Sequence, residues 1–273
     1  MKYSILGCGW LGFPLAQHLI ANGNIVYGST TTEKKTDIFA AENITPYIIK
    51  IENNNIFGPI DAFLDSDVLI IDVPFSKQKE TFKSYQKLAI LIEKSTISKV
   101  LFISSTSVYT NTNGIVTEDM AFKVNPEKKT LVDLEKLFLQ HSGFETTVIR
   151  FSGLIGRDRN PGNFFKEGRV VKNGMAPINL IHLDDCILII HKICMTTFNG
   201  EIFNAAADTH PTKKDFYTAA SNANKLVPAT FLSNEDYNYK IISNEKLKQQ
   251  LNYSLKYPDL MKLLQKNDPK RIA

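Results

Sequence analysis

The chain has 273 residues, and its 32 Lys and Arg residues against 28 Asp and Glu residues give a formal net charge of +4. Hydrophobic residues make up 43% of the chain and charged residues 22%, which is typical of a soluble globular protein and excludes the disordered and fibrous classes. No block of Lys and Arg dominates, and no apolar run approaches the roughly 20 residues that cross a bilayer, so we expect no nucleic-acid and no membrane partner.

The first half of the chain alternates short β-branched runs with longer amphipathic stretches. This alternation predicts right-handed crossovers and a parallel sheet covered by helices on both faces. The expected strands are Tyr3–Leu6, Ile25–Ser29, Pro46–Ile51, Asp67–Val73, Lys99–Ser104 and Thr146–Phe151. The expected helices are Leu11–Asn22, Lys34–Glu42, Gln78–Lys94 and Leu131–His141.

The pattern loosens after Phe151. Residues 152–181 are interrupted by Gly and Pro and are expected to form long loops. A helix over Asp184–Thr196, a short strand over Ile202–Asn204 and a helix over Lys213–Asn224 should follow, with more helix near the end.

The chain has three cysteines, Cys8, Cys186 and Cys194. Their low, odd number argues against a disulfide framework and fits a reducing cytoplasm, so we predict a cytoplasmic protein. Cys8 lies near an expected helix N-terminus, which would lower the pKa of its thiol, but we expect this thiol to be passive. Cys186 and Cys194 suit small core positions.

The first expected strand leads into Gly7-Cys8-Gly9-Trp10-Leu11-Gly12, which opens the first helix. This is the G-x-G-x-x-G pattern of a dinucleotide-binding turn in the required strand–helix context. Gly7 allows the tight turn, Gly9 lets the backbone approach a pyrophosphate, and Gly12 lets the helix pack closely on the strand. The free N–H groups at the helix start favour the anion. We therefore predict that these six residues bind a dinucleotide, with Trp10 as a wall of the groove.

The end of the second strand indicates which dinucleotide is bound. An NAD site usually carries Asp or Glu there for the ribose hydroxyls, whereas this chain has hydroxyls and then cations, and its first carboxylate is Glu33. Lys and hydroxyl groups suit a 2′-phosphate, so we favour NADP(H) over NAD(H). The alternative is that the lysines form a solvated helix start. The residues concerned are Ser29, Thr30, Thr31, Lys34 and Lys35.

These features predict an α/β fold, a Rossmann-type doubly wound parallel sheet with a small C-terminal substrate lobe. We assign residues 1–151 to the dinucleotide-binding domain and residues 152–273 to the smaller lobe, which interleaves with the sheet domain. The ligands of such a sheet bind at its carboxyl edge.

Further stretches resemble a known family, the extended short-chain dehydrogenase/reductases, which include the NAD-dependent sugar epimerases and dehydratases. Besides Gly7–Gly12, these are Ser104–Tyr109 (S-S-T-S-V-Y) and Val148–Gly156. Asn179–Asp185 (N-L-I-H-L-D-D) and Phe203–Asp208 look like an atypical, nucleoside-diphosphate-sugar epimerase-like branch. The resemblance covers about residues 1–220 and leaves a homodimer open.

The resemblance implies a role for each matching position. Ser105 looks like the hydroxyl that hydrogen-bonds the reacting oxygen. His182 and Arg157 lie in segments that face the substrate in relatives. The further positions at which relatives contact the cofactor are Val73, Pro74 and Ser104.

The family's usual Tyr-x-x-x-Lys pair is missing, because none of the ten Tyr residues has Lys four positions on. In relatives the ammonium lowers the pKa of the phenol so that it acts as general acid and base. If Glu135 matches the glutamate of the catalytic helix, Glu127 and Leu131 occupy the places of Tyr and Lys. Compensating groups are Tyr109, near Ser105 in the sequence, and Glu127, Lys128 or His182.

Two further clusters have plain alternatives. One cluster comprises His182, Asp184, Asp185, Cys186, His191 and Cys194. His182 and Cys186 show a spacing that metal sites use, but the carboxylates suit the first turn of a helix, so we expect no metal. The segment 157–162 (R-D-R-N-P-G) is either an anion clamp built on Arg157 or a solvated loop.

We expect an NAD(P)-binding oxidoreductase or epimerase-like protein with non-standard catalytic residues and a sugar-nucleotide or small carbonyl substrate. The competing hypothesis is a non-catalytic NADP(H)-binding sensor or regulatory protein, which needs no acid or base beside the nicotinamide.

Overall fold

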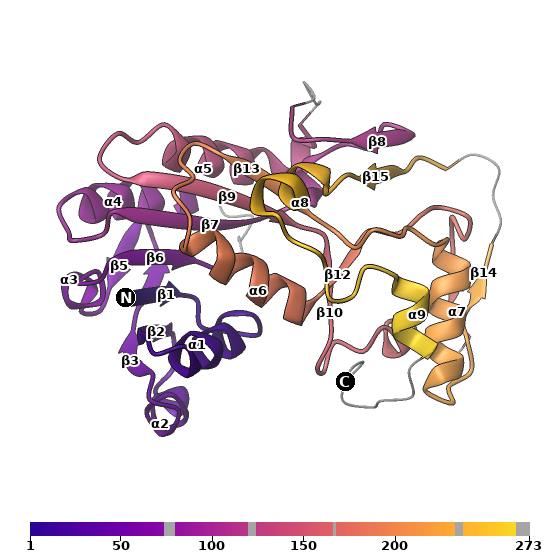
Figure 1. Cartoon of the computed structure of the whole chain (residues 1–273), viewed down its shortest axis with the longest axis horizontal. Helices are drawn as coiled ribbons and strands as arrows, with labels where there is room; N and C mark the ends of the chain where they lie inside the picture. Colours follow the sequence, from indigo (N-terminus) through magenta and orange to yellow (C-terminus); the bar gives the residue numbers. More distant parts are fainter. Residues whose placement is uncertain (74–79, 120–123, 166–167, 233–236, 266–273) are drawn as a thin grey trace. The chain divides into compact units, whose positions relative to one another are not determined.

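The computed structural model describes residues 1–73, 80–119, 124–165, 168–232 and 237–265. Its main element is a parallel sheet of seven strands in the order β13-β9-β7-β6-β1-β2-β3 (Figure 1). The chain runs outward from β1 to β3 and returns beside β1 with β6, so the strand order reverses at β1. The doubly wound parallel sheet predicted from the sequence is confirmed. The strands are β1 (Lys2–Leu6), β2 (Ile25–Thr30), β3 (Thr45–Ile48), β6 (Val68–Ile71), β7 (Lys99–Ser105), β9 (Glu145–Phe151) and β13 (Ile202–Ala205).

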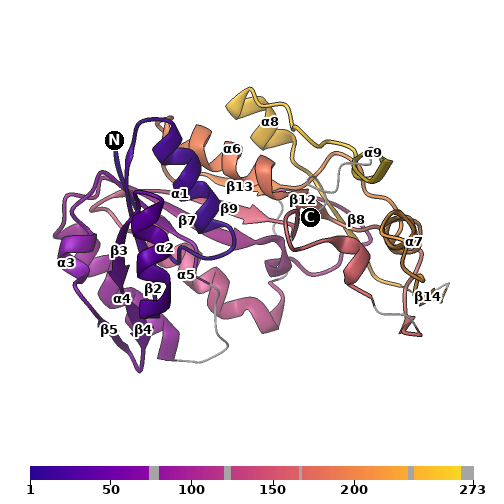
Figure 2. The same cartoon turned by 90° about the horizontal axis from the view of Figure 1, so that it is seen from below.

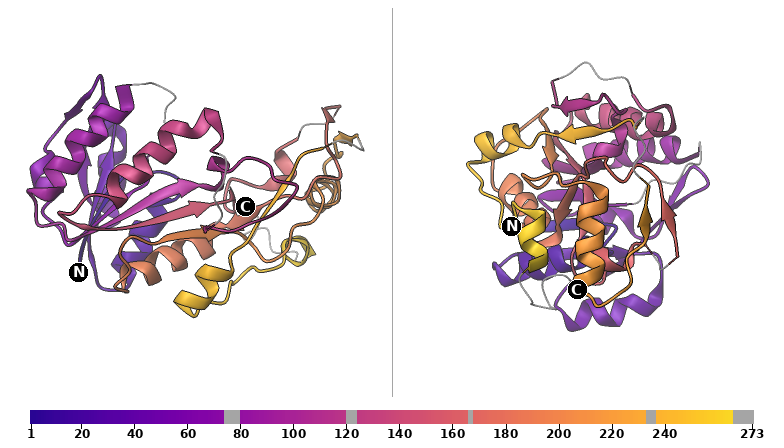
Figure 3. Two further views of the ribbon diagram at one scale, coloured as in Figure 1. Left: turned by 90° about the horizontal axis from the view of Figure 1, so that it is seen from above. Right: turned by 90° about the vertical axis from the view of Figure 1, so that its right-hand side faces the viewer.

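Helices cover both faces of this sheet. The helices α1 (Gly12–Ala21) and α6 (Leu183–Cys194) lie on one face, where His18 and His191 meet with ring nitrogens 2.8 Å apart (Figure 2). The helices α4 (Glu80–Glu93) and α5 (Lys129–Leu139) lie on the other face (Figure 3). Strand β6 is buried along its whole length, as its continuous apolar run predicts for a strand covered on both faces.

The chain forms two compact units. Unit 1 comprises residues 1–108, 124–150 and 187–202, and unit 2 comprises residues 109–123, 151–186 and 203–273. The chain therefore passes between the units several times. The division at residue 151 drawn from the sequence stays a prediction.

The described residues of unit 2 form three short parallel strand pairs and three helices. An apolar cluster that includes Phe216, Leu260 and Leu263 packs α7 against α9. The strand pairs are β8 (Gly114–Val116) with β15 (Lys240–Ile242), β10 (Gly153–Ile155) with β12 (Leu180–His182), and β11 (Val170–Val171) with β14 (Thr230–Phe231). The helices are α7 (Lys213–Ala223), α8 (Glu245–Leu251) and α9 (Leu260–Gln265).

Two sequence predictions need correction. The strand expected over Pro46–Ile51 is two strands: β3 ends at Ile48, and β4 (Lys50–Glu52) forms an antiparallel hairpin with β5 (Asn55–Phe57). The two turn residues between β4 and β5 are both Asn with positive φ, the conformation that tight hairpins require and Asn tolerates. Residues 152–181, expected as loops, hold β10, β11 and β12, which are too short to leave a periodic pattern.

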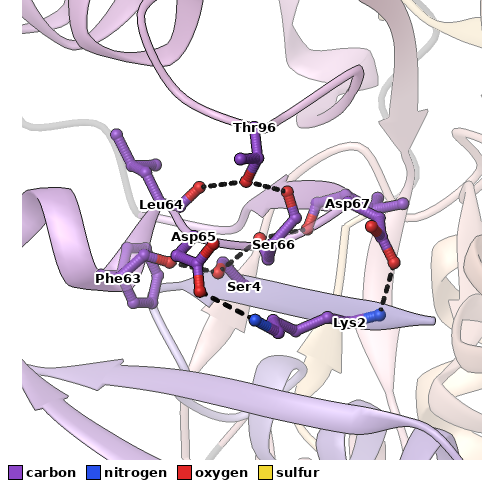
Figure 4. A network of polar contacts seen from close by, with 9 residues as sticks. Lys2, Ser4, Phe63, Leu64, Asp65, Ser66, Asp67 and Thr96 are labelled. Carbon is purple, nitrogen blue, oxygen red and sulfur yellow. Dashed lines mark hydrogen bonds and ion pairs between the residues drawn. The ribbon is translucent and has the colours of Figure 1, made fainter.

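The amino ends of β1 and β6 share a buried polar network (Figure 4). The Ser4 hydroxyl donates to the carbonyl oxygen of Phe63 and lies 2.8 Å from the hydroxyl of Ser66. Thr96 donates to the carbonyl oxygen of Ser66 at 3.1 Å. Ser4 and Ser66 are buried, so these bonds replace the water that both hydroxyls lose on folding.

The rim of the same network is exposed. The backbone N–H of Lys2 donates to Asp67 Oδ2 at 2.8 Å, and the Lys2 ammonium pairs with Asp65 at 2.8 Å. The polar groups of this network are therefore paired with one another within the protein.

Candidate functional site

The turn between β1 and α1 forms the first part of the candidate site. Gly7 has a φ of +94°, and a Cβ at this position would lie 2.3 Å from the carbonyl oxygen of Asp72. A Cβ at Gly12 would lie 2.8 Å from the carbonyl oxygen of Gly7 and 3.0 Å from Ile5 Cγ2. Both positions therefore require glycine, Gly7 for the turn and Gly12 for the contact between helix and strand.

Gly9 differs from the other two glycines of the motif. Among the described residues, and apart from its two chain neighbours, a Cβ at Gly9 would find one atom within 4 Å, the Gly7 carbonyl oxygen at 3.8 Å, which is an ordinary van der Waals distance. Within this part of the chain, neither packing nor a positive φ requires glycine at this position. A glycine without such a packing reason is what a dinucleotide turn uses where its backbone approaches the pyrophosphate.

Ser29, at the end of β2, holds this turn in place. Its hydroxyl oxygen accepts the Gly7 N–H at 2.8 Å, and its carbonyl oxygen accepts the Cys8 N–H at 3.0 Å. Ser29 is 3% exposed, so it acts on the glycine turn rather than presenting a free hydroxyl to solvent. Sequence reasoning identified the residue but not this task.

The thiol of Cys8 is buried under the turn. Burial first, and the charge of Asp72 second, raise the pKa of Cys8 to about 12. The helix N-terminus that would lower the pKa is thus outweighed by desolvation. Cys8 stays a protonated thiol at neutral pH.

The end of β2 presents hydroxyls and cations. Thr30 is buried, and its hydroxyl accepts the N–H of Thr32 at 3.2 Å. Thr31, Lys34 and Lys35 are exposed. Lys34 and Lys35 belong to the short 3₁₀ turn Glu33–Lys35, which begins two residues after the strand, beyond Thr31 and Thr32.

Asp72 and Val73 follow the carboxyl end of β6, next to the glycine turn. Both are half-buried, and the Asp72 N–H donates to the Leu6 carbonyl oxygen at 2.8 Å. Sequence reasoning missed Asp72, although its place at the end of a buried strand was a signal. Pro74, predicted to contact a cofactor, lies outside the described residues.

Ser104, near the carboxyl end of β7, belongs to a buried ion pair. Its hydroxyl donates to Glu135 Oε1, and the Arg150 guanidinium donates to both oxygens of the same carboxylate, at 3.0 Å and 2.6 Å. All three side chains are buried. Because the Ser104 proton is used by Glu135, this hydroxyl is left with acceptor capacity toward any ligand.

Ser105 is the half-buried hydroxyl that follows Ser104. Its Oγ accepts the Ser107 N–H at 3.1 Å, and among the described residues no acceptor takes the Ser105 proton. The hydroxyl is therefore oriented by the backbone and keeps its donor capacity.

The helix that would carry Tyr-x-x-x-Lys presents other groups. Glu127 is exposed in the turn Pro126–Lys128, and its N–H donates to Asn125 Oδ1 at 3.1 Å. Leu131, in the first turn of α5, is buried. A buried leucine cannot supply the charge that lowers a phenol pKa or binds a ribose.

In unit 2, Tyr109 is almost fully buried. Its hydroxyl donates to Asn204 Oδ1 at 2.8 Å, and the Asn204 N–H donates to Glu118 Oε1 at 2.6 Å. This burial gives Tyr109 a structural task and argues against the acid–base role considered for it. Burial raises the pKa of Glu118, although the Asn204 N–H opposes the rise.

Lys240 is a half-buried lysine that sequence reasoning did not identify. Its ammonium donates to the Tyr109 carbonyl oxygen at 2.6 Å, and burial lowers its pKa. Among the described residues, no carboxylate forms an ion pair with it. Side chains with a shifted pKa often serve chemistry, so Lys240 and Glu118 are two of the titratable candidates of unit 2.

Arg157 lies at the tip of a tight turn. It has a φ of +48°, and the N–H and carbonyl groups of Gly156 and Arg159 pair on either side of it. Arg157 and Arg159 are exposed. The geometry presents two guanidinium groups to solvent and leaves both alternatives open, an anion clamp and a solvated loop.

His182 connects β12 to α6. Its Nδ1 accepts the Asp184 N–H at 3.1 Å, as the side chain of a helix cap does. The ring packs on Tyr257 with centroids 4.2 Å apart, and a Cβ at Gly156 would lie 2.9 Å from Nε2. The predicted substrate residue therefore has a structural task as well.

Asp184 and Asp185, the two carboxylates after His182, bind residues 253–257. Both lie in the first turn of α6, as predicted. Asp185 accepts the N–H groups of Lys256 and Tyr257 and the hydroxyl of Tyr253, and Asp184 pairs with the Lys256 ammonium at 2.6 Å. This network gives residues 253–257, which the sequence left without a role, a structural one.

The part of the chain that the structure describes contains no group of three or more His, Cys, Asp or Glu side chains arranged to hold a metal ion. Within the same residues, no helix combines the length and the apolar character of a membrane crossing. All three cysteines are described, and each is a buried thiol outside any disulfide.

Solved structures with this fold define the class of protein. A functionally unknown conserved protein from Silicibacter pomeroyi superimposes with a TM-score of 0.82 at 18% identity, over 100% of this chain and 99% of that chain. The UDP-glucuronic acid 4-epimerase of Bacillus cereus, in complex with UDP-glucuronic acid and NAD, has a TM-score of 0.78 at 20% identity, over 97% of both chains. The chain thus has the fold of the NAD-dependent sugar-nucleotide epimerases and dehydratases, which are extended short-chain dehydrogenase/reductases.

The sequence places the chain in a family. It is 32% identical to the protein YeeZ of Escherichia coli K12 over 266 residues, which are 94% of this chain and 97% of that protein. The chain therefore belongs to the YeeZ family. No family model matches the chain.

Proposed function

We propose that the chain binds a nicotinamide dinucleotide at the carboxyl ends of β1, β2, β6 and β7. The observation that carries this proposal is Gly9, a glycine that the protein's own packing does not need and whose missing side chain leaves the backbone accessible. Gly7 and Gly12 on either side are fixed by packing. The reversal of strand order at β1 supports the same place, since doubly wound sheets bind ligands where their order reverses.

We further propose that the dinucleotide is NADP(H) rather than NAD(H). The end of β2 carries Thr31, Lys34 and Lys35 in exposed positions and no carboxylate of its own. Ammonium and hydroxyl groups suit a 2′-phosphate, whereas the ribose diol of NAD(H) is usually held by a carboxylate at this place.

The bound nicotinamide would supply hydride transfer, as cofactor chemistry. The chain would contribute Ser105, whose O–H has no acceptor among the described residues and would hydrogen-bond a reacting oxygen of the substrate. Arg157 and His182 remain candidates for substrate contact. Epimerases with this fold bind sugar nucleotides, so we propose a sugar-nucleotide or small carbonyl substrate and an oxidoreductase or epimerase-like reaction.

A second candidate function is a non-catalytic NADP(H)-binding sensor. The observation that favours it is the burial of Leu131 and the exposure of Glu127. If Glu135 matches the glutamate of the catalytic helix, these two residues occupy the places of the catalytic Lys and Tyr. A sensor needs the cofactor site but no proton donor beside the nicotinamide. The two functions share every binding residue and differ only in turnover.

The first experiment is a titration of the purified protein with NADPH and NADH, read by nicotinamide fluorescence. We expect tighter binding of NADPH. Gly9→Ala should weaken binding at least about tenfold, because its methyl group takes the space of the pyrophosphate, while the protein keeps its stability. Gly114→Ala is the matched control, since a Cβ at Gly114 would meet no atom within 4 Å, and it should leave the affinity unchanged.

Outcomes of this titration separate the proposals. Tighter binding of NADH would remove the 2′-phosphate interpretation and keep the dinucleotide site. If neither dinucleotide binds, or if Gly9→Ala binds as well as the unaltered chain, the proposed site is wrong.

Turnover is tested with the cofactor-loaded protein and UDP-glucuronic acid or UDP-glucose, followed by absorbance of reduced nicotinamide and by product analysis. Loss of turnover in Ser105→Ala with unchanged NADPH affinity would support the enzyme. Binding without turnover of these probes would favour the sensor.

A further inference from the structure

Two histidines join the helices α1 and α6 within unit 1. His18 Nε2 lies 2.8 Å from His191 Nδ1, and the two rings meet edge to face with centroids 4.9 Å apart. The side-chain amide of Asn22 lies 3.5 Å from the same nitrogen of His18. Both histidines are half-buried. Two ring nitrogens at this distance share one N–H, so at least one of the two imidazoles is neutral in this arrangement.

The histidine pair has no counter-charge in the part of the chain that the structure describes. Neither α1 nor β2, on which α1 packs, contains Lys, Arg, Asp or Glu. Glu42, which follows α2 (Thr36–Ala41), accepts a hydrogen bond from Gln17 of α1 at 3.0 Å and forms no described ion pair with either ring. Burial lowers the pKa of both histidines, and the charge of His191 lowers that of His18 further.

The other ionisable groups around the pair are cations or neutral side chains. On α6, Lys192 directly follows the histidine. From β1 comes Tyr3, whose hydroxyl lies 4.0 Å from Met195 Sδ and is uncharged at neutral pH, because burial raises its pKa to about 12. The Lys99 ammonium donates to carbonyl oxygens at the end of α6, and the ammonium of Met1 donates to the side chain of Asn24. None of these groups favours a second proton on the pair.

The helix α1 connects the pair to the glycine turn. Gly12 is the first residue of α1, and a Cβ there would lie 2.8 Å from the Gly7 carbonyl oxygen. The start of the helix and the turn are therefore in close contact, and His18 lies on the same short helix. A displacement of α1 at His18 moves the N–H groups that the helix start presents to an anion.

We propose that His18 and His191 form a pH-sensitive switch between α1 and α6, and that its opening loosens the dinucleotide turn. While one imidazole is neutral, the hydrogen bond between the ring nitrogens joins the two helices. When both rings carry a second proton, both facing nitrogens are donors and no lone pair is left to accept. The two cations then repel each other, and the rings separate. The effect on the turn rests on the proposed dinucleotide site, whereas the switch itself does not.

The switch is tested without nucleotide, by urea unfolding at neutral and acidic pH. Both histidines have a pKa below the ordinary 6.5, so the unfolded chain takes up protons first. The stabilisation by the pair is present in full above pH 6.5 and is lost as the pH falls toward the lowered values. In His18→Gln, the amide donates to a neutral His191 and accepts from a protonated one, so protonation breaks no contact.

The equilibrium constant of unfolding should therefore rise about tenfold less between pH 7 and pH 5 in His18→Gln than in the unaltered chain. His191→Gln is the reciprocal variant, with the same expected result, and replaces His18→Gln if that variant folds poorly. His141→Gln is the matched control, because the ring of His141 belongs to the same unit and faces Glu93 at 3.9 Å rather than a second imidazole. It should keep the acid sensitivity of the unaltered chain.

The effect on the turn is tested by the dissociation constant of NADPH. Because the 2′-phosphate of NADPH also titrates near pH 6, the unaltered chain is compared with His18→Gln, in which that contribution is the same. Between pH 7 and pH 5.5, the dissociation constant should rise about fivefold more in the unaltered chain than in the variant.

Equal acid sensitivity of unfolding in the unaltered chain and in both glutamine variants of the pair would overturn the switch, and so would an equal loss of sensitivity in His141→Gln. If the switch holds but NADPH binding responds to acid equally in both chains, the effect on the turn is wrong. If the unaltered chain binds no dinucleotide, the proposed function and the effect on the turn fail together, while the unfolding experiment still decides on the switch.

Discussion

The two ends of strands β1 and β6 are built in opposite ways. At the amino end, buried hydroxyls of Ser4 and Ser66 bond to each other and to backbone carbonyl groups. At the carboxyl end, the chain turns through glycines, and Gly9 leaves the space of a side chain empty. The same strands therefore have a closed end, the hydrogen-bonded amino end around Ser4 and Ser66, and a carboxyl end that can receive a ligand.

This difference shows where stability and function lie in unit 1. Buried hydrogen bonds at the amino end fix the strands without needing any partner from outside. At the carboxyl end the backbone stays accessible. Hydrogen bonds from the turn to Ser29, and from the Asp72 N–H to the Leu6 carbonyl oxygen, hold this end in position. Substitutions at the two ends should therefore separate, one set altering unfolding and the other altering ligand binding.

The largest effect is expected for Gly7→Ala, which breaks the carboxyl end itself. Its Cβ would meet a backbone oxygen at 2.3 Å, and the φ of +94° adds strain. We expect a loss of about 3 kcal/mol in the free energy of unfolding, measured by denaturant titration. Gly23→Ala shares a positive φ but would have no atom within 4 Å, so it should cost less. Equal losses in both variants would show that no clash exists at Gly7.

Ser4→Ala should break the closed end. Removing this hydroxyl leaves the carbonyl group of Phe63 without its donor, so the free energy of unfolding should fall by about 1–3 kcal/mol. The dissociation constant of NADPH should not change. Ser98→Ala, whose exposed hydroxyl bonds the Asp67 carbonyl oxygen, is the control with a smaller loss. A change in NADPH affinity in Ser4→Ala would contradict the separation of the two ends.

Cys8 makes the carboxyl end sensitive to alkaline pH. The folded chain raises the pKa of this thiol to about 12 from an ordinary 9.0, so it holds the proton more tightly than the unfolded chain does. Stability from this group is complete below pH 9 and is lost as the pH rises toward 12, by about 1 kcal/mol between pH 9 and pH 10. Cys8→Ala should flatten that decline in unfolding experiments at pH 8 to 10. Rapid alkylation of Cys8 at pH 8 in the folded protein would contradict the raised pKa.

The smallest effect is expected for Lys2→Met at the rim of the closed end. The ammonium pairs with Asp65 on the surface, where solvent screens the attraction, and the backbone N–H of residue 2 still bonds Asp67. The unfolding midpoint should stay within experimental error of the unaltered chain. A marked loss of stability would mean that the rim contributes as much as the buried hydroxyls.

Much of the fold could be predicted because its signals are local. The apolar run of β6 and the alternation of strand and helix define a parallel sheet. The spacing of Gly7, Gly9 and Gly12 defines a turn between strand and helix. The hairpin of β4 and β5 was missed although its Asn turn was visible, and β10 and β12 were missed because three residues are too few to show a period.

The candidate site was harder to predict, because a residue type does not state its partner. Ser29 and Ser104 stay predicted cofactor contacts, and the structure gives each a partner that the sequence did not indicate: the Ser29 hydroxyl accepts the Gly7 N–H, and the Ser104 hydroxyl donates to Glu135. Tyr109 was considered as one of several compensating acid–base groups, and its buried hydroxyl donates to Asn204. Each partner comes from a segment far away in the sequence.

The sequence by itself determined the class of sheet, the glycine turn and the absence of Tyr-x-x-x-Lys, because periodicity and motif spacing act over a few residues. Only the tertiary structure decided which hydroxyls donate inside the protein, as that of Ser104 does, and which find no acceptor in the described part of the chain, as that of Ser105. It also brought Asp72 beside the first turn of α1, because hydrogen bonding between parallel strands sets side by side residues that lie some sixty positions apart along the chain.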